Sequence, residues 1–185
     1  MRFRSREQVR RSTAPAGSCR PGGRSRRAAI IVELLLVFPI LFIATLAIFE
    51  FGILVIVDQT VTAAATEGTR EAAKVGAVTN EVAMVIDEIL SVHQIVFDPT
   101  ATNATDDARV IIEYGAPIST TTERGNTTIV CSANGPAVGT NEVKVTVCVN
   151  VTNAAGEQPV PDWLSTFGFS LVGRKFEISS LANVE

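Results

Sequence analysis

This chain has few of the residues that usually build catalytic or metal sites. Its 185 residues include one histidine and three cysteines. A lone histidine cannot form a metal site without other ligands, and no cluster of them appears at metal-binding spacing. Phosphate-binding loops, GxSxG and HExxH motifs are missing, and the acids are scattered. We therefore expect no enzymatic activity, no catalytic residue, no metal and no cofactor.

Charged residues are also scarce, at 19%, while hydrophobic residues make up 46%. Disordered chains combine few apolar residues with a high net charge, so this composition excludes that class. The formal net charge of −3 hides a strong asymmetry. Residues 1–27 hold nine of the 16 basic residues and one of the 19 acidic residues. A basic leader therefore precedes an acidic body.

A long apolar run, residues 28–57, separates the leader from the body. It contains only two charges, Glu33 and Glu50, and no charge between them. A helix rises about 1.5 Å per residue, so about 20 residues cross a hydrocarbon core of about 30 Å. The run predicts a transmembrane helix over residues 29–57, in which Pro39 is expected to produce a kink.

The arginines predict the direction of this helix. Lys and Arg accumulate on the cytoplasmic side of membrane helices. We therefore place the leader, residues 1–28, in the cytoplasm and residues 58–185 outside the inner membrane, in the periplasm or beyond. A cleaved secretory signal is a weaker alternative, because its apolar region spans only about 7–15 residues. A nucleic-acid-binding patch is disfavoured by the leader's Pro and Gly content, which also predicts that it lacks regular structure.

The helical pattern continues beyond the membrane. Small and apolar residues repeat at helical spacing on one face, and Gly76 is expected to end the helix. A second helix is predicted to begin at Asn80 as its N-cap and to end at His93, which we interpret as a surface or partly packed residue. The face consists of Val57, Val61, Ala64, Gly68, Ala72 and Val75.

After Pro99 the sequence changes to a β pattern. Residues 108–114, 127–131 and 143–151 are rich in Val, Ile and Thr and predict strands, while 174–181 is either a fourth strand or a short helix. In the third segment the valines alternate with Lys144, Thr146, Cys148 and Asn150, as in a half-buried antiparallel strand. We predict an α+β fold: a long N-terminal helix, a second short helix and a small antiparallel sheet.

Two of the cysteines, Cys131 and Cys148, lie on neighbouring predicted strands. The space outside a bacterial inner membrane is oxidising, so a disulfide between them is permitted. It would lie on the solvent side of the sheet, and the alternative is two free thiols.

Two groups of residues carry a resemblance to known proteins. Residues 26–33 (RRAAIIVE), followed by an apolar run, resemble the processing region of type IV pilin-like proteins. A second, longer pattern resembles the TadE-like family of tight-adherence pilus proteins. That pattern comprises Glu50-Phe51-Gly52, Asp58-Gln59, Ala63-Ala64 and Glu67-Gly68-x-Arg70-x-Ala72-Ala73.

The resemblance implies a pilin-like fold and cleavage of the leader by a prepilin peptidase. Glu33 matches the glutamate at the fifth mature position, which places the cut between Ala28 and Ala29. Ala28 stands where the family usually has Gly, and Leu34 stands where an aromatic residue commonly follows. The implied partners are the inner membrane, the peptidase, other pilin or pseudopilin subunits and the assembly platform.

The two acids of the apolar run have separate expected roles. An ionised carboxylate in hydrocarbon is costly unless it is paired. Cleavage would create an ammonium group on Ala29, and Glu33 of one subunit could pair with that group of a neighbour. The alternative for Glu33 is pairing with Arg26 or Arg27 at the cytoplasmic interface. Glu50 is expected to mark the outer interface.

The leading hypothesis is a minor pilin or pseudopilin that acts structurally in the assembly of a tight-adherence pilus. The runner-up is an uncleaved, single-pass anchored binding module whose sheet captures an extracellular ligand. A membrane-tethered enzyme would require a constellation that the sequence lacks. Only the first hypothesis predicts loss of the leader.

Overall fold

The computed structural model describes residues 24–74, 76–132, 136–153 and 158–185. The chain divides into two compact units, Met1–Ile40 and Leu41–Glu185, and one helix contributes to both. The elements are α1 (Arg24–Ala72), α2 (Thr79–Ser91), β1 (Ala108–Tyr114), β2 (Thr121–Gly125), β3 (Glu142–Asn150), the 3-10 helix η1 (Trp163–Phe167) and β4 (Lys175–Asn183).

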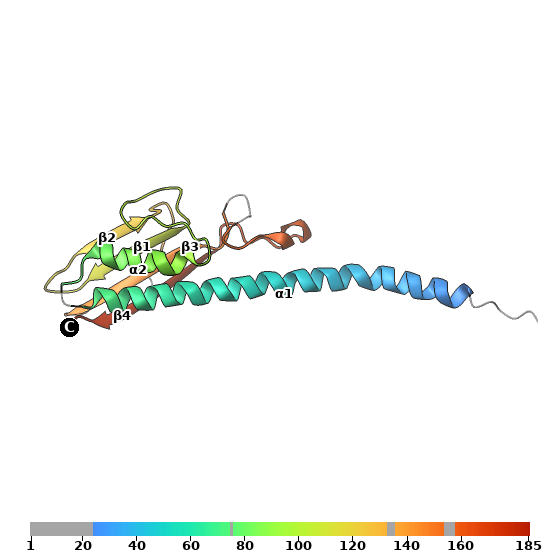
Figure 1. Ribbon diagram of the computed structural model, residues 1–185, viewed down its shortest axis with the longest axis horizontal. Helices are drawn as coiled ribbons and strands as arrows, with labels where there is room; N and C mark the ends of the chain where they lie inside the picture. The colour runs from blue at the N-terminus through green and yellow to red at the C-terminus, as the bar shows by residue number, and fades with distance from the viewer. Residues whose placement is uncertain (1–23, 75, 133–135, 154–157) are drawn as a thin grey trace, which may run out of the picture. The chain divides into compact units, whose positions relative to one another are not determined.

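The four strands form one antiparallel sheet in the order β2-β1-β3-β4 (Figure 1). Strand β3 lies in the interior of the sheet, paired with β1 on one side and β4 on the other. In its register Val147 lies opposite Val110 of β1 and Ile178 of β4. This arrangement of one long helix, one short helix and a small antiparallel sheet confirms the predicted α+β fold.

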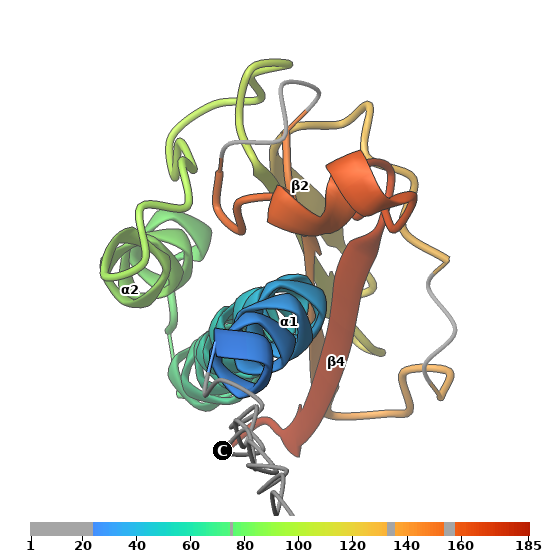
Figure 2. The same ribbon diagram turned by 90° about the vertical axis from the view of Figure 1, so that its right-hand side faces the viewer.

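Helices α1 and α2 lie on the same side of the sheet (Figure 2). The alternating valines of β3 are buried together with the predicted small-residue face of α1 and with apolar residues of α2. The apolar faces of the two helices pack against the apolar face of the sheet, and this contact forms the core of the unit. The buried members include Val57, Val61, Ala64 and Ala72 of α1, Val82, Ile86 and Leu90 of α2, and Val143, Val145, Val147 and Val149 of β3. Val75, expected on the same face, lies outside the described residues.

At Gly68, α1 packs closely against α2. A Cβ atom added there would lie 2.7 Å from Cδ1 and 2.8 Å from Cγ1 of Ile86, and 3.6 Å from Cγ1 of Val145. An added methyl group would therefore have to displace the Ile86 side chain of α2, while Val145 of β3 lies at ordinary contact distance.

The opposite face of β3 is also buried, contrary to the half-buried strand that the sequence predicts. Lys144, Thr146 and Cys148 are all less than 5% exposed. The alternation of apolar and polar residues in the sequence identifies only the face that packs on the helices. It does not show that the loop joining β2 to β3 covers the other face, where Cys131 is bonded to Cys148. Lys144 is compensated there by Glu113, whose carboxylate lies 2.5 Å from its ammonium group.

The second predicted strand is wrong. Residues 127–131 form a turn and loop, and β2 precedes them. Gly125 ends β2 with φ at 75°, and the Asn126 carboxamide oxygen then accepts a hydrogen bond from the Thr128 amide at 2.9 Å. Such a side-chain-to-backbone bond two residues ahead forms a turn, which overrides the strand-like composition of the residues that follow.

The predicted helix ends need smaller corrections. Helix α1 ends at Ala72, and Gly76 follows with φ at 77°. Val78, not Asn80, is the N-cap of α2, and Asn80 lies inside the first turn, where its side chain accepts a hydrogen bond from Arg124. Helix α2 ends at Ser91, so that His93 lies in the turn beyond it. Residues 174–181, which the sequence predicts as either a strand or a short helix, lie almost entirely in strand β4.

Three expectations concern residues that the structure describes only in part. The leader is expected to lack regular structure, but residues 1–23 lie outside the described residues, and Arg24 begins α1. The sequence also predicts a turn between the second and third predicted strands, at Asn134, Gly135, Pro136 and Gly139, and the first two of these residues lie outside the described ranges. Pro39 lies inside α1, and its kink stays a prediction.

Substituting Gly68 with Ala should destabilise the full chain in detergent by about 1–3 kcal/mol, because the added methyl group overpacks the contact with Ile86. Thermal unfolding followed by near-ultraviolet circular dichroism measures the change. The matched control is Gly52→Ala in the same helix, where a Cβ meets nothing within 4 Å. That variant should be neutral or more stable by up to about 1 kcal/mol, from helix propensity. Equal effects of the two substitutions would contradict the packing described.

Candidate functional site: the apolar half of the long helix

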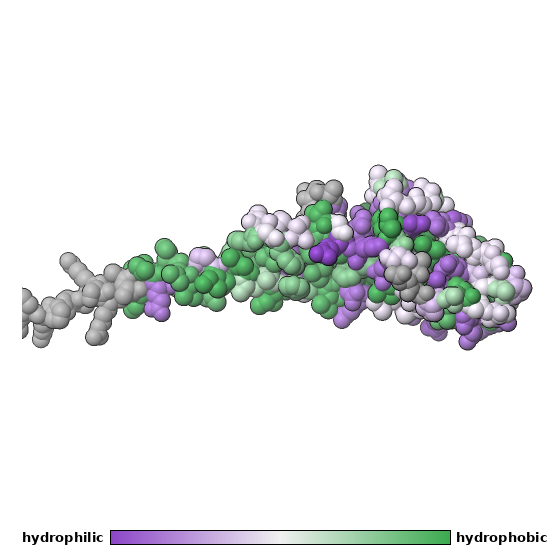
Figure 3. Space-filling model, turned by 180° about the vertical axis from the view of Figure 1, so that it is seen from behind, coloured by the Kyte–Doolittle hydropathy of each residue, from purple (hydrophilic) through white to green (hydrophobic). Residues whose placement is uncertain are grey.

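The first part of α1 exposes an almost continuous apolar surface. The large hydrophobic side chains of residues 30–42 are mostly more than half exposed, as are Ile48 and Phe49. Figure 3 shows the hydrophobic colour along this part of the helix. By length and composition, the helix from Ile30 to Ala72 is able to cross a membrane. A soluble protein rarely leaves so large an apolar patch open, so the surface indicates a single-pass membrane anchor.

Glu33 is the one charged side chain in this surface between Ile30 and Phe49, and it is exposed. Ala28 and Ala29, the expected cleavage residues, lie in the same helix. Four residues, about one helical turn, separate Ala29 from Glu33 in the chain. A carboxylate at this position faces the surroundings of the helix and requires a partner outside its own apolar stripe.

Glu50, the second acid of the apolar run, is 1% exposed. Its Oε2 atom accepts a hydrogen bond from the backbone N–H of Leu164 at 3.1 Å. Leu164 belongs to η1, whose free N–H groups form a favourable site for a carboxylate. The other carboxylate oxygen, Oε1, is buried and has no hydrogen-bond partner within the described parts of the chain. The C-terminal region therefore folds back onto α1 and covers the acid.

Asp162 shapes the segment that covers Glu50. Its Oδ2 atom accepts hydrogen bonds from the Ser170 hydroxyl at 2.8 Å and from the Leu171 amide at 3.1 Å. These bonds close the chain into a loop around η1. Sequence reasoning missed both Asp162 and Leu164, because a backbone donor has no sequence signature. The only available signal is the run WLSTFGFSLV, which carries several aromatic residues and no charge.

The motif residues on α1 divide between two faces. Ala64, Gly68, Ala72 and Ala73 are buried against the rest of the unit. Gln59, Ala63, Glu67 and Arg70 are exposed, and the Glu67 and Arg70 side chains form an ion pair of 3.7 Å. An exposed pair at this spacing contributes only tenths of a kcal/mol. The pattern thus combines a packing face with a polar free face.

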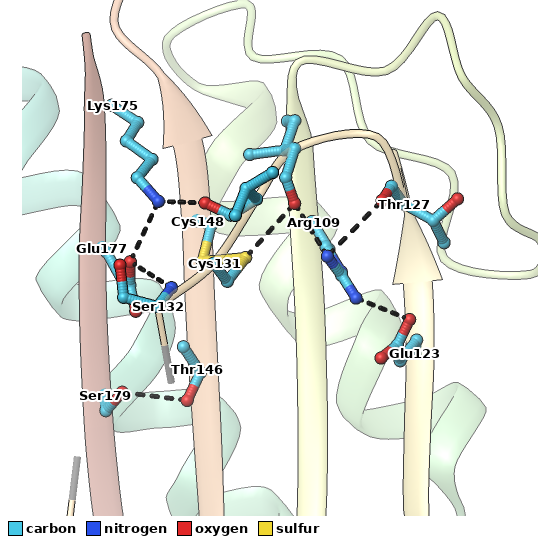
Figure 4. The surroundings of a disulfide bond; sticks show 12 residues. Arg109, Glu123, Thr127, Cys131, Ser132, Thr146, Cys148, Lys175, Glu177 and Ser179 are labelled. Atoms are coloured by element: carbon cyan, nitrogen blue, oxygen red, sulfur yellow. Dashed lines mark hydrogen bonds and ion pairs between the residues drawn. A yellow bond between two sulfur atoms is a disulfide. The ribbon is translucent and has the colours of Figure 1, made fainter. Parts of the chain in front are cut away.

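The two cysteines meet on the sheet face opposite the helices (Figure 4). Cys148 of β3 is bonded to Cys131, with their Cα atoms 6.1 Å apart. Beside them, Glu177 of β4 accepts a hydrogen bond from the Ser132 amide at 2.8 Å and pairs with Lys175 at 3.3 Å. Burial acts to raise the pKa of Glu177, but these two partners outweigh it and hold the pKa below its ordinary value. The Cys131–Cys148 disulfide and the Glu177 carboxylate together hold the loop that joins β2 to β3 against the sheet.

Groups of three or more His, Cys, Asp or Glu side chains suited to a metal ion do not occur in the described ranges. His93 lies half-buried beside an open hollow between α1 and α2, where Ile56, Ile89 and Val92 are its neighbours. Gln59 and Thr60 of α1 are the polar residues that line the same hollow.

Comparison with known proteins bears on α1. A family model described as TadE-like protein matches residues 28–70. The resemblance to the TadE-like family is confirmed over this segment. The match begins at the expected cleavage residue Ala28, includes Glu33 and Glu50, and ends at Arg70. The match to the TadE-like family suggests involvement in tight-adherence pilus assembly. No curated protein and no solved structure matches the chain.

Replacing Glu50 with Ala should release η1 from the helix, because the buried Leu164 amide loses its acceptor. An unsatisfied buried donor costs about 1–3 kcal/mol. Limited chymotrypsin digestion of the full chain in detergent should therefore cut faster between residues 163 and 169. Glu50→Gln keeps an acceptor oxygen and should stay close to wild type. Equal cleavage rates in Glu50→Ala and wild type would contradict the role of this contact.

Removing the disulfide should lower the free energy of unfolding by about 3 kcal/mol, the chain-entropy value for a loop of this length. The variant Cys131→Ser/Cys148→Ser and urea unfolding of the full chain in detergent measure this loss. Reduced wild type provides the control and should unfold at the same urea concentration as the double variant. A double variant as stable as oxidised wild type would show that the bond adds nothing.

Proposed function

We propose that this chain is a minor pilin or pseudopilin that acts structurally in the assembly of a tight-adherence pilus. The residues before Ala29 are removed by a prepilin peptidase, α1 anchors the mature chain in the inner membrane, and the sheet unit lies outside. Its partners are other pilin subunits and the assembly platform. The observation that carries the proposal is the TadE-like match on a helix whose apolar surface exposes a single carboxylate.

Two features support the orientation. Nine arginines precede the span, and positive residues accumulate on the cytoplasmic side of membrane helices. The disulfide lies in the sheet unit, and structural disulfides persist in oxidising compartments such as the periplasm. Both support a cytoplasmic N-terminus and a sheet unit outside the membrane.

Two features support processing between Ala28 and Ala29. Glu33 stands at the fifth position after this bond, as the resemblance to pilin-like proteins requires. Ala28 is a small residue in place of the usual Gly, and the TadE-like match begins at it. Loss of the leader would also remove nine positive charges from the membrane surface, leaving the mature helix with a free amine at its start.

The free amine gives Glu33 a partner. Apolar helices in a bilayer associate without a hydrophobic driving force, so a polar contact decides their register. Glu33 is exposed, and the Ala29 ammonium group of a neighbouring subunit would neutralise it. In this proposal, Glu33 sets the register between the helices of neighbouring subunits during assembly.

Substituting Glu33 with Ala should abolish incorporation into pili without preventing membrane insertion, because the apolar span is retained. Complementation of a deletion strain, with pili counted by electron microscopy and the protein located by membrane fractionation, measures both properties. Glu88→Ala, which removes an exposed acid on α2, is the matched control and should leave piliation unchanged. Normal piliation with Glu33→Ala would contradict the register role.

A further inference from the structure

An apolar loop, residues 163–172, projects large side chains into the surroundings beside α1. It contains no charged residue, and we refer to it as the aromatic loop. Trp163, Phe167, Phe169 and Val172 are each between 45% and 53% exposed. Four large apolar side chains exposed within ten residues form a patch that a soluble surface rarely carries.

The exposure of these side chains is built into the loop. Leu164 and Leu171 are buried, and they anchor the two ends of the loop in the unit. The Asp162 carboxylate accepts the Ser170 hydroxyl and the Leu171 amide, and Glu50 accepts the Leu164 amide. The polar groups of the loop are thus satisfied from inside, while its rings point outward.

The loop contacts α1 where the charge-free apolar stretch ends. It touches the helix through Glu50, and the Phe169 ring lies 6.3 Å from the ring of Phe51, centroid to centroid. About 20 helical residues, from Ile30 to Phe49, precede this contact, and that length spans a hydrocarbon core of about 30 Å. The loop therefore lies at the level of the outer end of the span.

We propose that the aromatic loop lies in the outer interface of the bilayer, with its rings among lipid headgroups and the first acyl carbons. The proposal rests on α1 spanning the membrane, which is part of the proposed function. Trp favours this interface because its ring is apolar and its N–H is polar, whereas the Phe side chains contribute apolar surface that the first acyl carbons cover. Arg174 follows the loop and is exposed, as suits a neighbour of anionic headgroups.

Lipid is a better occupant than a second protein chain because the patch continues the membrane-facing surface of α1. Ile48 and Phe49 precede the contact on the helix, and both are widely exposed. The loop then serves as a depth stop: it holds the sheet unit against the bilayer surface and keeps Glu50 covered where the helix leaves the hydrocarbon.

Trp163 is the only tryptophan of the chain, so its fluorescence reports directly on the loop. The full chain is reconstituted into vesicles of phosphatidylcholine and phosphatidylglycerol, and flotation selects the inserted protein. Lipids with a nitroxide near the headgroup or at mid-chain, and aqueous iodide, serve as quenchers. We expect a blue-shifted emission, a larger loss of intensity with the shallow nitroxide than with the deep one, and weak quenching by iodide.

The control moves the tryptophan to the other end of the unit, in the variant Trp163→Phe/Ile118→Trp. Ile118 is exposed and lies beside the C-terminal end of α1, near Ala72. Its tryptophan should be quenched by iodide and not by either lipid. Phe167→Asp in the otherwise unchanged chain should reduce lipid quenching of Trp163 while flotation stays the same.

Three outcomes would overturn the proposal. Strong iodide quenching of Trp163 in floated protein would place the loop in water. Protection from both lipid and iodide would mean that a second protein chain covers it. Failure to float would refute the anchor and the proposed function with it, whereas a water-exposed loop on inserted protein would leave the pilus role untouched.

Discussion

The sheet unit depends on the packing of α1 onto α2 and β3 through a face of small residues that includes Gly68. Small residues at Ala64, Gly68 and Ala72 let the helix backbone settle onto the sheet, and Ile86 and Val145 fill the space around them. This contact commits one face of the helix to the core. The sheet covers only the later turns of α1, so the apolar residues before Val57 remain largely exposed. A helix with half of its length packed and half apolar and open requires lipid or neighbouring helices, which is the physical basis for the membrane anchor and for the proposed role in assembly.

The two acids of the apolar run are compensated differently. Glu50 is covered from within the chain, by an amide that lies 114 residues away in the sequence. Glu33 is exposed and lies one helical turn beyond the expected new N-terminus at Ala29. Glu50 therefore joins the C-terminal loop to the helix, and Glu33 is available to a neighbouring subunit. The same helix thus combines a contact that completes the fold with a contact that the proposed assembly requires.

Local pattern predicted the elements that carry their own signal. The apolar run predicted α1, and β-branched residues predicted β1 and β3. Strand β2, with the sequence TTERG, has no apolar alternation, and only its pairing with β1 shows it to be a strand. The burial of Cys148 and the covering of Glu50 depend on loops that return from distant parts of the chain. Sequence periodicity reports which face of an element is apolar, and it carries no information on what a loop places against the other face.

The N-terminal sequence and intact mass of the protein purified from its native membranes test the central claim most directly. The claim is that a peptidase cuts a basic leader from a helix that stays in the membrane. It predicts an integral membrane protein that begins at Ala29, with the Glu33 carboxylate four residues beyond the new amine. A membrane protein that begins at Met1 would contradict processing and favour an uncleaved anchored binding module, and a chain that begins beyond Phe49 would contradict the anchor itself.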